Sequence, residues 1–364
     1  MYNWQHKNWP NFTYSINKLQ EISVLFAQEY GLVNGLVLGL NDELKQEALL
    51  EILISEAIKT SEIEGEYMSR EDVMSSIKNN LGINQVVVKD KRASGIAKLM
   101  LEVNQNIKLP LSLDKILGWH KILMEYNPKI NAGEWRKGIE PMQVVSGVYG
   151  REVVHYEAPP SAKVPLEMEA FLDWYTNIKL PVNHQISNAL LKSAIVHLYF
   201  ESIHPFEDGN GRIGRALAEF ALSASLQEPV MLSISKIIEK DKKKYYNQLK
   251  FAQRSLDITN WLNYFAQLIL DAQKDAKELI HFTLKKAKFF DKYEKQFNER
   301  QLKVIQRMLE NGTEGFEGGM TAKKYITITK ISKATATRDL QDLQELGVFA
   351  QEGAGRSVRY ELVL

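Results

Sequence analysis

The sequence predicts a mainly α-helical fold with one β-hairpin near its middle and a winged helix-turn-helix at its C-terminal end. Apolar residues recur at three- and four-residue spacing along most of the chain, as they do on one face of an α-helix. Two short β-type runs, 143–147 and 152–156, lie around Gly147 and Gly150, which is a hairpin signal. Residues 297–364 combine helical pieces with two strands, the composition of a winged helix.

Helical periodicity places the remaining elements. The first helical stretch covers 14–40 as one or two helices, and the next begins after Asn41, a suitable N-cap, and ends before Gly65. A polar, lysine-rich stretch follows around 78–92. Further helices are predicted at 93–106, 112–126, 163–178, 186–203, 211–225, 241–253 and 258–288. The C-terminal part is predicted to hold helical pieces at 301–310, 321–327, 329–332 and 335–346, with strands at 348–351 and 357–362.

The composition excludes several classes of protein. The 364 residues include 46 Lys and Arg against 45 Asp and Glu, so no excess of charge points to nucleic acid or an anionic membrane. The chain has no cysteine, which excludes disulfides, thiolate catalysis and zinc-finger ligation. No signal peptide is recognisable, and no window approaches the roughly 18 consecutive apolar residues of a membrane helix. We expect a cytoplasmic protein without a membrane partner.

One stretch, Ile203 to Arg215, concentrates residues that carry chemistry. It contains the spacing Gly-x-Gly-x-x-Gly at 209–214, which also occurs in dinucleotide-binding folds. That fingerprint requires a preceding strand, whereas the residues before it recur at helical spacing. The sequence therefore argues against a dinucleotide-binding fold.

The same stretch suits phosphate binding instead. A helix ends, a short loop carries His204 and Asp208 with two glycines, and a new helix begins near 210. Glycines and a helix N-terminus turn backbone N–H groups toward an anion. Asp208 offers oxygen to Mg²⁺, Arg212 and Arg215 can bind phosphate oxygens, and an imidazole can accept a proton from a hydroxyl near neutral pH. The alternative is a capping histidine in a plain glycine-rich turn.

The stretch resembles the motif of the Fic family, His-Pro-Phe-x-(Asp/Glu)-Gly-Asn-Gly-Arg-x-x-Arg, at every fixed position. The resemblance covers about residues 95–270 and includes His120, the segment Gly133–Arg136 and the segment Asp257–Leu262. It implies three domains: an N-terminal helical extension at 1–94, a Fic core at 95–290 and a winged helix at 297–364. Some relatives form homodimers, so a homodimer is a further expectation.

The resemblance implies transfer of AMP from ATP to a Ser, Thr or Tyr hydroxyl of a target protein. His204 would be the general base and Asp208 the Mg²⁺ ligand. The anion hole for the α-phosphate would be formed by Gly209, Asn210 and Gly211, and the outer phosphates would be bound by Arg212 and Arg215. For adenine, Tyr245 and Tyr246 are candidates for stacking, with core packing as the alternative; Tyr246 is the residue we assign to the nucleotide.

Some Fic proteins carry an inhibitory helix with the motif (Ser/Thr)-x-x-x-Glu-(Gly/Asn), which Thr60, Glu64 and Gly65 match within a helix at 42–65. Thr60 and Glu64 are four residues apart and share one helix face. The resemblance implies that Glu64 pairs with Arg215 and blocks productive ATP binding. It also implies that the same glutamate can support removal of AMP. The alternative is a solvated last-turn glutamate.

The hairpin between Val145 and Tyr156 resembles the target-docking flap of the family, where a target backbone would pair with a strand edge. Val153, Val154 and His155 are the residues expected to hold the target. The alternative is a hairpin that only covers core.

The winged helix leaves a competing hypothesis open, namely a DNA-binding regulator whose Fic core senses nucleotide. The segment 335–340 resembles a recognition helix, and Arg356 and Arg359 lie on the expected wing. Residues 301–364 hold nine Lys and Arg and eight Asp and Glu, a net charge of +1, which is weak for a DNA-binding surface. A Fic enzyme that transfers another phosphate-linked group is the third alternative. The complete set of His204, Asp208 and Arg215 favours an enzyme.

Overall fold

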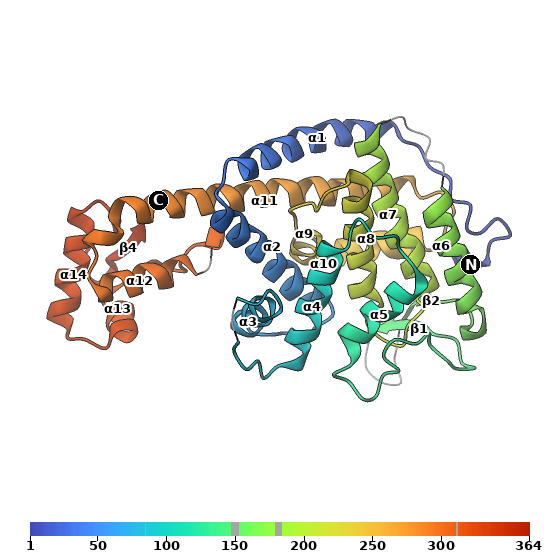
Figure 1. Ribbon diagram of the computed structural model, residues 1–364, viewed down its shortest axis with the longest axis horizontal. Coiled ribbons are helices and arrows are strands. Elements are labelled where there is room, and N and C mark those ends of the chain that lie inside the picture. Colours follow the sequence, from blue (N-terminus) through green and yellow to red (C-terminus); the bar gives the residue numbers. More distant parts are fainter. Residues whose placement is uncertain (84, 147–152, 179–183, 311) are drawn as a thin grey trace. The chain divides into compact units, whose positions relative to one another are not determined.

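The computed structural model describes residues 1–83, 85–146, 153–178, 184–310 and 312–364. Helices dominate it, as predicted (Figure 1). They are α1 (Asn17–Leu38), α2 (Asp42–Ile63), α3 (Arg70–Asn80), α4 (Lys91–Gln105), α5 (Leu113–Met124), α6 (Val164–Asn177), α7 (Gln185–Ile203), α8 (Asn210–Leu226), α9 (Ile234–Lys240), α10 (Lys242–Ala252), α11 (Thr259–Tyr293), α12 (Glu299–Leu309), α13 (Ala322–Thr329) and α14 (Lys333–Glu345). The strands are β1 (Gln143–Ser146), β2 (Val153–Glu157), β3 (Phe349–Glu352) and β4 (Arg359–Leu362).

The chain forms two compact units. The first contains residues 1–35 and 49–276, and the second contains residues 36–48 and 277–364. Within the described ranges, no helix is both long enough and apolar enough to cross a bilayer.

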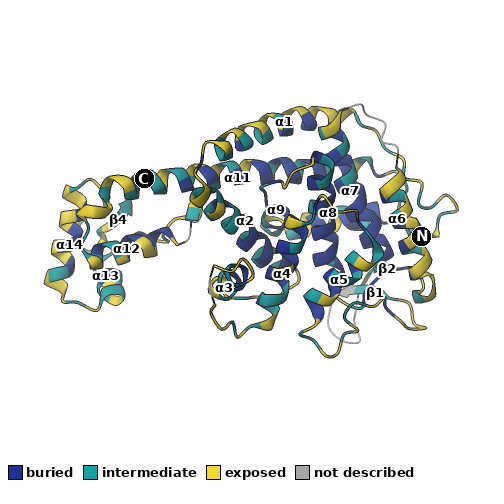
Figure 2. Ribbon diagram, in the orientation of Figure 1, coloured by how far each residue is buried: buried dark blue, intermediate teal, exposed yellow. Residues whose placement is uncertain are grey.

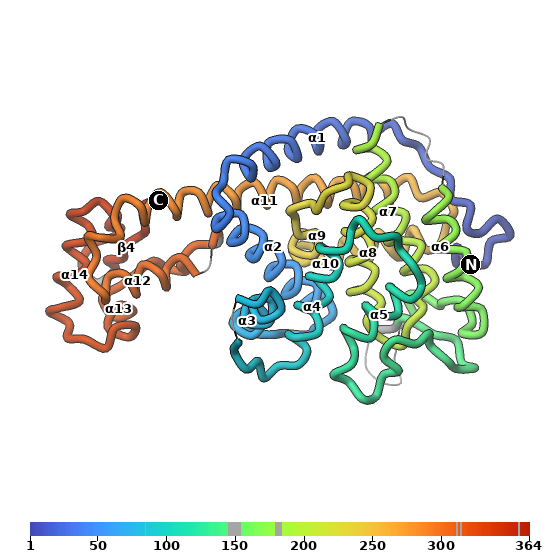
Figure 3. Tube along the Cα trace, in the orientation of Figure 1, coloured from blue at the N-terminus to red at the C-terminus, as the bar shows by residue number. Residues whose placement is uncertain are grey.

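Helices α7 and α8 form the centre of the first unit. Helix α7 is apolar on all sides, and nearly every residue from Ala189 to Ile203 is buried, as its dark colour in Figure 2 shows. Helix α8 packs along it, and α4 and α5 contact α8 in turn. Figure 3 follows the chain from α7 through a tight turn into α8. This turn holds the motif residues, so two buried helices that pack together position them.

Helix α2 begins and ends where the sequence predicts. The side chain of Asn41 accepts a hydrogen bond from the Leu44 N–H at 2.9 Å, as expected of an N-cap. Gly65 follows the helix with φ +81°, a left-handed conformation that glycine adopts without strain. Leu53 and Ala57 of α2 belong to the same apolar core as α7 and α8.

Two short helices were missed, and one predicted piece is wrong. Helix α3 is strongly polar, and its beginning is fixed by the Ser69 side chain, which accepts from the Asp72 N–H. Helix α9 spans only seven residues. The predicted helical piece at 329–332 is absent because Lys330 adopts a left-handed conformation (φ 58°) and Ser332 caps α14. Short or polar helices carry too little periodicity to be predicted.

The predicted hairpin is present as the antiparallel pair β1–β2, in which Gln143 faces Glu157 and Ser146 faces Val153. The register shifts after Val144, which marks a bulge in the strand pair. The predicted turn at Gly147 and Gly150 lies outside the described residues.

In the second unit, α12, α13 and α14 pack around an apolar core with the antiparallel pair β3–β4. The carboxylate of Asp339 accepts hydrogen bonds from Arg300 (2.8 and 3.0 Å) and from the Tyr325 hydroxyl (3.0 Å), which ties the three helices together. These elements occur in the order expected of a winged helix; the assignment itself and the DNA-binding alternative stay predictions. Arg359 pairs with Glu352 at 2.7 Å, so its charge is compensated within the strand pair.

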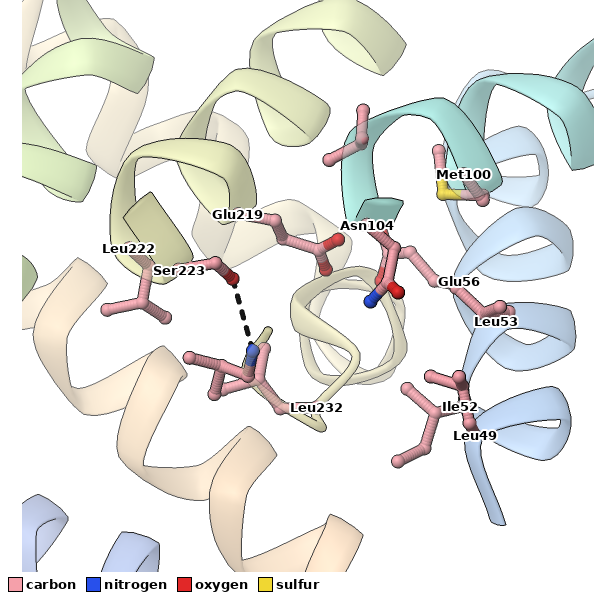
Figure 4. Close-up of a pocket in the computed structure, with 12 residues that line it drawn as sticks. Leu49, Ile52, Leu53, Glu56, Met100, Asn104, Glu219, Leu222, Ser223 and Leu232 are labelled. Atoms are coloured by element: carbon pink, nitrogen blue, oxygen red, sulfur yellow. Dashed lines mark hydrogen bonds between the residues drawn. The ribbon is translucent and has the colours of Figure 1, made fainter. Parts of the chain in front are cut away.

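A buried carboxylate holds the middle of α2 against the core. Glu56 accepts hydrogen bonds from the Ser233 hydroxyl (2.7 Å), the Ser235 N–H (2.9 Å) and the Ser235 hydroxyl. Glu219 of α8 lies beside it, and its carboxyl points into a small cavity of about 20 Å³ (Figure 4). Burial and then the charge of Glu56 raise the pKa of Glu219 well above its usual range.

We expect Glu219→Gln to stabilise the protein increasingly as the pH rises. A carboxyl whose pKa is higher in the folded state contributes stability below about pH 4.5 and loses it as the pH increases through the folded pKa. Glutamine has no such loss. Thermal unfolding at pH 5 and pH 8 measures the effect, with exposed Glu169→Gln as control. A difference between Glu219→Gln and the parent protein that does not change with pH would contradict this account.

Candidate functional site

The turn between α7 and α8 takes its shape from two left-handed residues. His204 follows α7 with φ 51° and donates its N–H to the Phe200 carbonyl at 2.9 Å. Gly209 precedes α8 with φ 80°. A left-handed conformation is uncommon for histidine and identifies a position where the surrounding structure imposes the backbone. The turn therefore presents the His204 side chain beside the N-terminus of α8.

Asn210 closes the turn. Its side-chain amide accepts from the Phe206 N–H at 2.9 Å and donates to the Phe206 carbonyl at 2.8 Å. The side chain is thus used within the loop, so the backbone N–H of Asn210 is the group left for anion binding. The Phe206 ring is fully buried and stacks on His120, with ring centroids 3.8 Å apart. Phe206 therefore anchors the loop to the core.

His120 supports the turn from α5. Its Nδ1 accepts from the Gly133 N–H at 2.9 Å, so Nε2 carries the proton and donates to the Asp208 carbonyl at 3.2 Å. Burial lowers the pKa of His120 to about 4, so the ring is neutral at physiological pH. His120 therefore supports the turn as a neutral, buried ring.

The imidazole of His204 lies near one acid. Its Nδ1 is 3.6 Å from Glu201 Oε2, and the two side chains are 14% and 6% exposed. In the part of the chain that the structure describes, neither His204 Nδ1 nor Glu201 Oε1 has a hydrogen-bond partner. Burial opposes the charge of Glu201, but His204, His197 and Arg215 together hold its pKa below its usual value. An ionised carboxylate in this position would stabilise an imidazolium that forms when the ring takes up a proton.

Two motif glycines make room for these groups. A Cβ on Gly214 would approach Glu201 Oε1 to 2.6 Å, and a Cβ on Gly211 would approach Glu64 Oε1 to 2.2 Å. The Gly-x-Gly-x-x-Gly spacing thus has a steric cause here, because Gly214 admits Glu201 and Gly211 admits Glu64. The Glu64 carboxylate lies directly against the first turn of α8, where the sequence places the anion hole.

The predicted contact between Glu64 and Arg215 is present. Arg215 Nη2 donates to Glu64 Oε1 at 2.8 Å and to the Thr60 carbonyl at 2.9 Å, and its Nε donates to the Thr60 hydroxyl at 2.8 Å. The Arg215 side chain is 1% exposed and that of Glu64 is 29% exposed. Burial opposes the charge of Arg215, yet Glu64 raises the pKa of this guanidinium further above its usual range. Gly65 ends α2 in the conformation that presents Glu64 here.

A second carboxylate, which the sequence analysis did not assign, holds the other motif arginine. Glu66 Oε2 accepts from Arg212 Nη1 at 2.7 Å, and Glu66 Oε1 accepts from the Tyr126 hydroxyl at 3.0 Å. Glu66 follows the left-handed Gly65, where helical periodicity no longer applies. Only the spacing of two acids around a glycine could have indicated it.

Arg136 is the other residue whose role the sequence did not show. Its guanidinium is 3% exposed and donates to the His204 carbonyl at 2.8 Å, to the Ser161 hydroxyl at 2.7 Å and to the Pro159 carbonyl. Its backbone N–H donates to the Pro205 carbonyl at 2.9 Å. Arg136 therefore connects the end of β2 to the turn that carries His204. Burial lowers its pKa to about 10, so it stays charged.

Asp208 is suited to bind Mg²⁺ together with the phosphates of a substrate. Its side chain is 50% exposed, and its Oδ1 accepts from the Gly209 N–H at 2.6 Å and lies 3.4 Å from Arg212 Nη2. The described residues contain no group of three or more metal-binding side chains. Mg²⁺ commonly binds through one or two carboxylates together with substrate phosphates, and one exposed carboxylate beside Arg212 suits that mode.

The two adjacent tyrosines of α10 differ in their surroundings. Tyr245 is buried, and its hydroxyl lies 2.8 Å from His197 Nε2, so it belongs to the core. Tyr246 is 39% exposed, with its ring 5.1 Å from that of Tyr245. Tyr246 is thus the accessible ring of the pair, and its role in adenine binding stays a prediction.

Of the expected flap residues, Val154 is 39% exposed and His155 is half-buried on β2. Val153 pairs with Ser146 through the backbone of the strand pair. The exposed Val154 is compatible with target docking.

Comparison with known proteins places this site in a family. Residues 110–222 match the model of the Fic/DOC family, and residues 2–83 match a domain of unknown function, DUF4172. The chain is 26% identical over 211 residues to the protein adenylyltransferase Fic of Drosophila willistoni, covering 56% of this chain and 37% of the relative. It is 30% identical over 142 residues to a probable protein adenylyltransferase of Aquifex aeolicus, covering 35% of this chain and 40% of the relative. The matches thus span well under half the length of these relatives.

Solved structures share the fold. A Fic family protein from Desulfovibrio desulfuricans matches with a TM-score of 0.57 and 20% identity, covering 97% of this chain and 98% of that one. A Fic domain-containing signalling protein from Bacteroides thetaiotaomicron matches with a TM-score of 0.53 and 19% identity, covering 71% of this chain and 97% of that one. The family model and the relatives together show that residues 110–222 form a Fic domain, and the solved structures show the shared fold.

Proposed function

We propose that this protein transfers AMP from ATP to a hydroxyl side chain of a target protein, and that Glu64 holds this activity in check. The observation that carries the proposal is the arrangement around the first turn of α8. There the turn before α8 carries both His204 and Asp208, and Arg215 is neutralised by the Glu64 carboxylate, which lies against Gly211. The relatives named as adenylyltransferases support the same reaction.

The proposed step is a nucleophilic substitution at the α-phosphorus of ATP. The target hydroxyl oxygen forms a bond to this phosphorus while the bond to the oxygen that bridges to the β-phosphate breaks, and pyrophosphate leaves. His204 accepts the hydroxyl proton. Glu201, ionised behind the imidazole, stabilises the imidazolium that results.

Backbone N–H groups at the start of α8 and the two arginines would bind the phosphates, because a helix N-terminus favours anions and guanidinium groups bind phosphate oxygens in pairs. Asp208 would hold Mg²⁺, which neutralises phosphate charge and orients the leaving group. The Glu64 carboxylate takes the space and the Arg215 contact that an outer phosphate needs. A negative charge in this position repels a phosphate and also occupies Arg215, the cation that the phosphate would bind. Glu64 would therefore inhibit the transfer of AMP.

We predict that Glu64→Gly increases incorporation of label from [α-³²P]ATP into protein by about tenfold or more, since tenfold corresponds to only about 1.4 kcal/mol. Adding His204→Ala to this variant should lower the rate by about 10²–10⁴-fold, the usual contribution of a general base. The assay uses the full chain with Mg²⁺ and a cell lysate as the source of targets.

The position of the label separates the alternatives. Labelling from [α-³²P]ATP without labelling from [γ-³²P]ATP indicates AMP transfer, whereas labelling from the γ position indicates transfer of another group. If Glu64→Gly labels no protein although the protein is folded, the proposal of AMP transfer is wrong. Loss of label from pre-modified protein incubated with the parent chain would reveal the reverse reaction.

We further predict that Asp208→Ala in the Glu64→Gly background lowers the transfer rate by about 10²–10³-fold, because a phosphate clamp contributes on this order. Glu207→Ala is the matched control, since Glu207 is the adjacent acid and bonds to Asn131 instead (3.0 and 3.2 Å). A titration with Mg²⁺ measures the effect. Equal transfer rates for both alanine variants would contradict the assignment of Asp208 as a magnesium ligand.

A further inference from the structure

We propose that Glu66 is a second carboxylate that occupies the nucleotide site, where it takes the place of a phosphate on Arg212. The inference rests on the proposed function, in which Arg212 and Arg215 bind the phosphates of ATP. In this arrangement one short segment, Glu64–Gly65–Glu66, neutralises both arginines, and a nucleotide must displace two carboxylates.

Arg212 is buried. Its side chain is 2% exposed, so its charge needs an anion nearby. Glu66 supplies the short contact, with 2.7 Å between Nη1 and Oε2, and Asp208 lies farther away at 3.4 Å from Nη2. Within the described residues Arg212 Nε has no hydrogen-bond partner. A guanidinium with an unused buried N–H can donate to one more oxygen, and a phosphate would provide that oxygen.

Two contacts hold Glu66 in place. The hydroxyl of Tyr126, a half-buried residue that follows α5, donates to Glu66 Oε1 at 3.0 Å, and Glu66 Oε2 accepts from Arg212. Both carboxylate oxygens are therefore engaged by the body of the Fic core. A surface glutamate that met an arginine by chance would lose side-chain entropy for little gain. Here the anchored geometry removes most of that cost before the ion pair forms.

The backbone turns at Gly65. Gly65 has φ +81°, which ends α2 and turns the chain so that the residues on either side of it both reach α8. Arg212 and Arg215 lie three residues apart and share one side of that helix. The two acids therefore match the two cations one to one.

This arrangement predicts a dependence on the number of phosphates. A ligand that places phosphates on both arginines must compete with both carboxylates, whereas AMP lacks the outer phosphates. Removing Glu66 should consequently strengthen binding of a triphosphate and leave AMP binding unchanged. If Glu66 instead oriented Arg212 for the nucleotide, its removal would weaken triphosphate binding.

The test is isothermal titration of the full-length protein with Mg²⁺ and either α,β-methylene-ATP, which cannot transfer AMP, or AMP. We expect Glu66→Gln to bind the triphosphate about tenfold more tightly than the parent, with AMP affinity unchanged. Glu62→Gln is the matched control: Glu62 lies in α2, is 20% exposed against 21% for Glu66, and pairs with Lys59 at 2.6 Å instead of a motif arginine. It should bind both ligands as the parent does.

Tyr126→Phe provides a second variant that keeps the Glu66 charge. It releases Glu66 Oε1 and should shift triphosphate affinity in the same direction by a smaller factor. Thermal unfolding of each variant checks that it is folded. Unchanged or weaker triphosphate binding by folded Glu66→Gln would overturn the proposal, as would equal tightening by Glu62→Gln.

The outcomes also separate this inference from the proposed function. If Glu64→Gly transfers AMP but Glu66→Gln binds the triphosphate like the parent, the role of Glu66 is wrong and the transfer reaction stands. If Glu66→Gln tightens binding but Glu64→Gly labels no protein, Glu66 competes with nucleotide and the transfer reaction is wrong. If no variant binds the triphosphate, both are wrong.

Discussion

A buried guanidinium group needs hydrogen-bond acceptors and a compensating charge, and the site of this protein is organised around three of them. Arg136, Arg212 and Arg215 are each 3% exposed or less. These arginines meet this need in two different ways. Arg136 finds neutral carbonyl and hydroxyl oxygens, whereas Arg212 and Arg215 find the carboxylates of the segment that follows α2.

The acceptors of Arg136 belong to the framework of the fold, whereas the carboxylates on Arg212 and Arg215 could be exchanged for another anion. The oxygens around Arg136 belong to the turn of His204 and to the end of the hairpin, so this cation is part of the framework. The carboxylates on Arg212 and Arg215 come from one segment 146 and 151 positions away in the chain. A free anion can replace them without unfolding the core. The phosphates of a nucleotide carry the right charge and geometry for that exchange.

Hydrogen bonds on both sides of Glu64 hold the segment that carries it. Glu56 binds the start of α9 through two serines, and Tyr126 binds Glu66 at the other end. Between these points the Glu64 carboxylate fills the space above Gly211. Release of Glu64 thus requires movement of a side chain only, whereas displacement of the whole segment would require both anchors to break.

The mainly α fold, the end of α2 at Gly65 and the residues of the α7–α8 turn could all be predicted from the sequence, because they depend on local periodicity, capping and a contiguous motif. The sequence also identified the pairing of Glu64 with Arg215, through the resemblance to Fic proteins. Three contacts could be found only in the folded molecule: Glu66 with Arg212, Arg136 with the turn of His204, and Glu219 with Glu56. These contacts join residues far apart in the chain, and no local pattern specifies which buried charge will meet which acceptor. The polar α3 and the short α9 escaped prediction for a related reason, since packing and caps fix them where periodicity is weak.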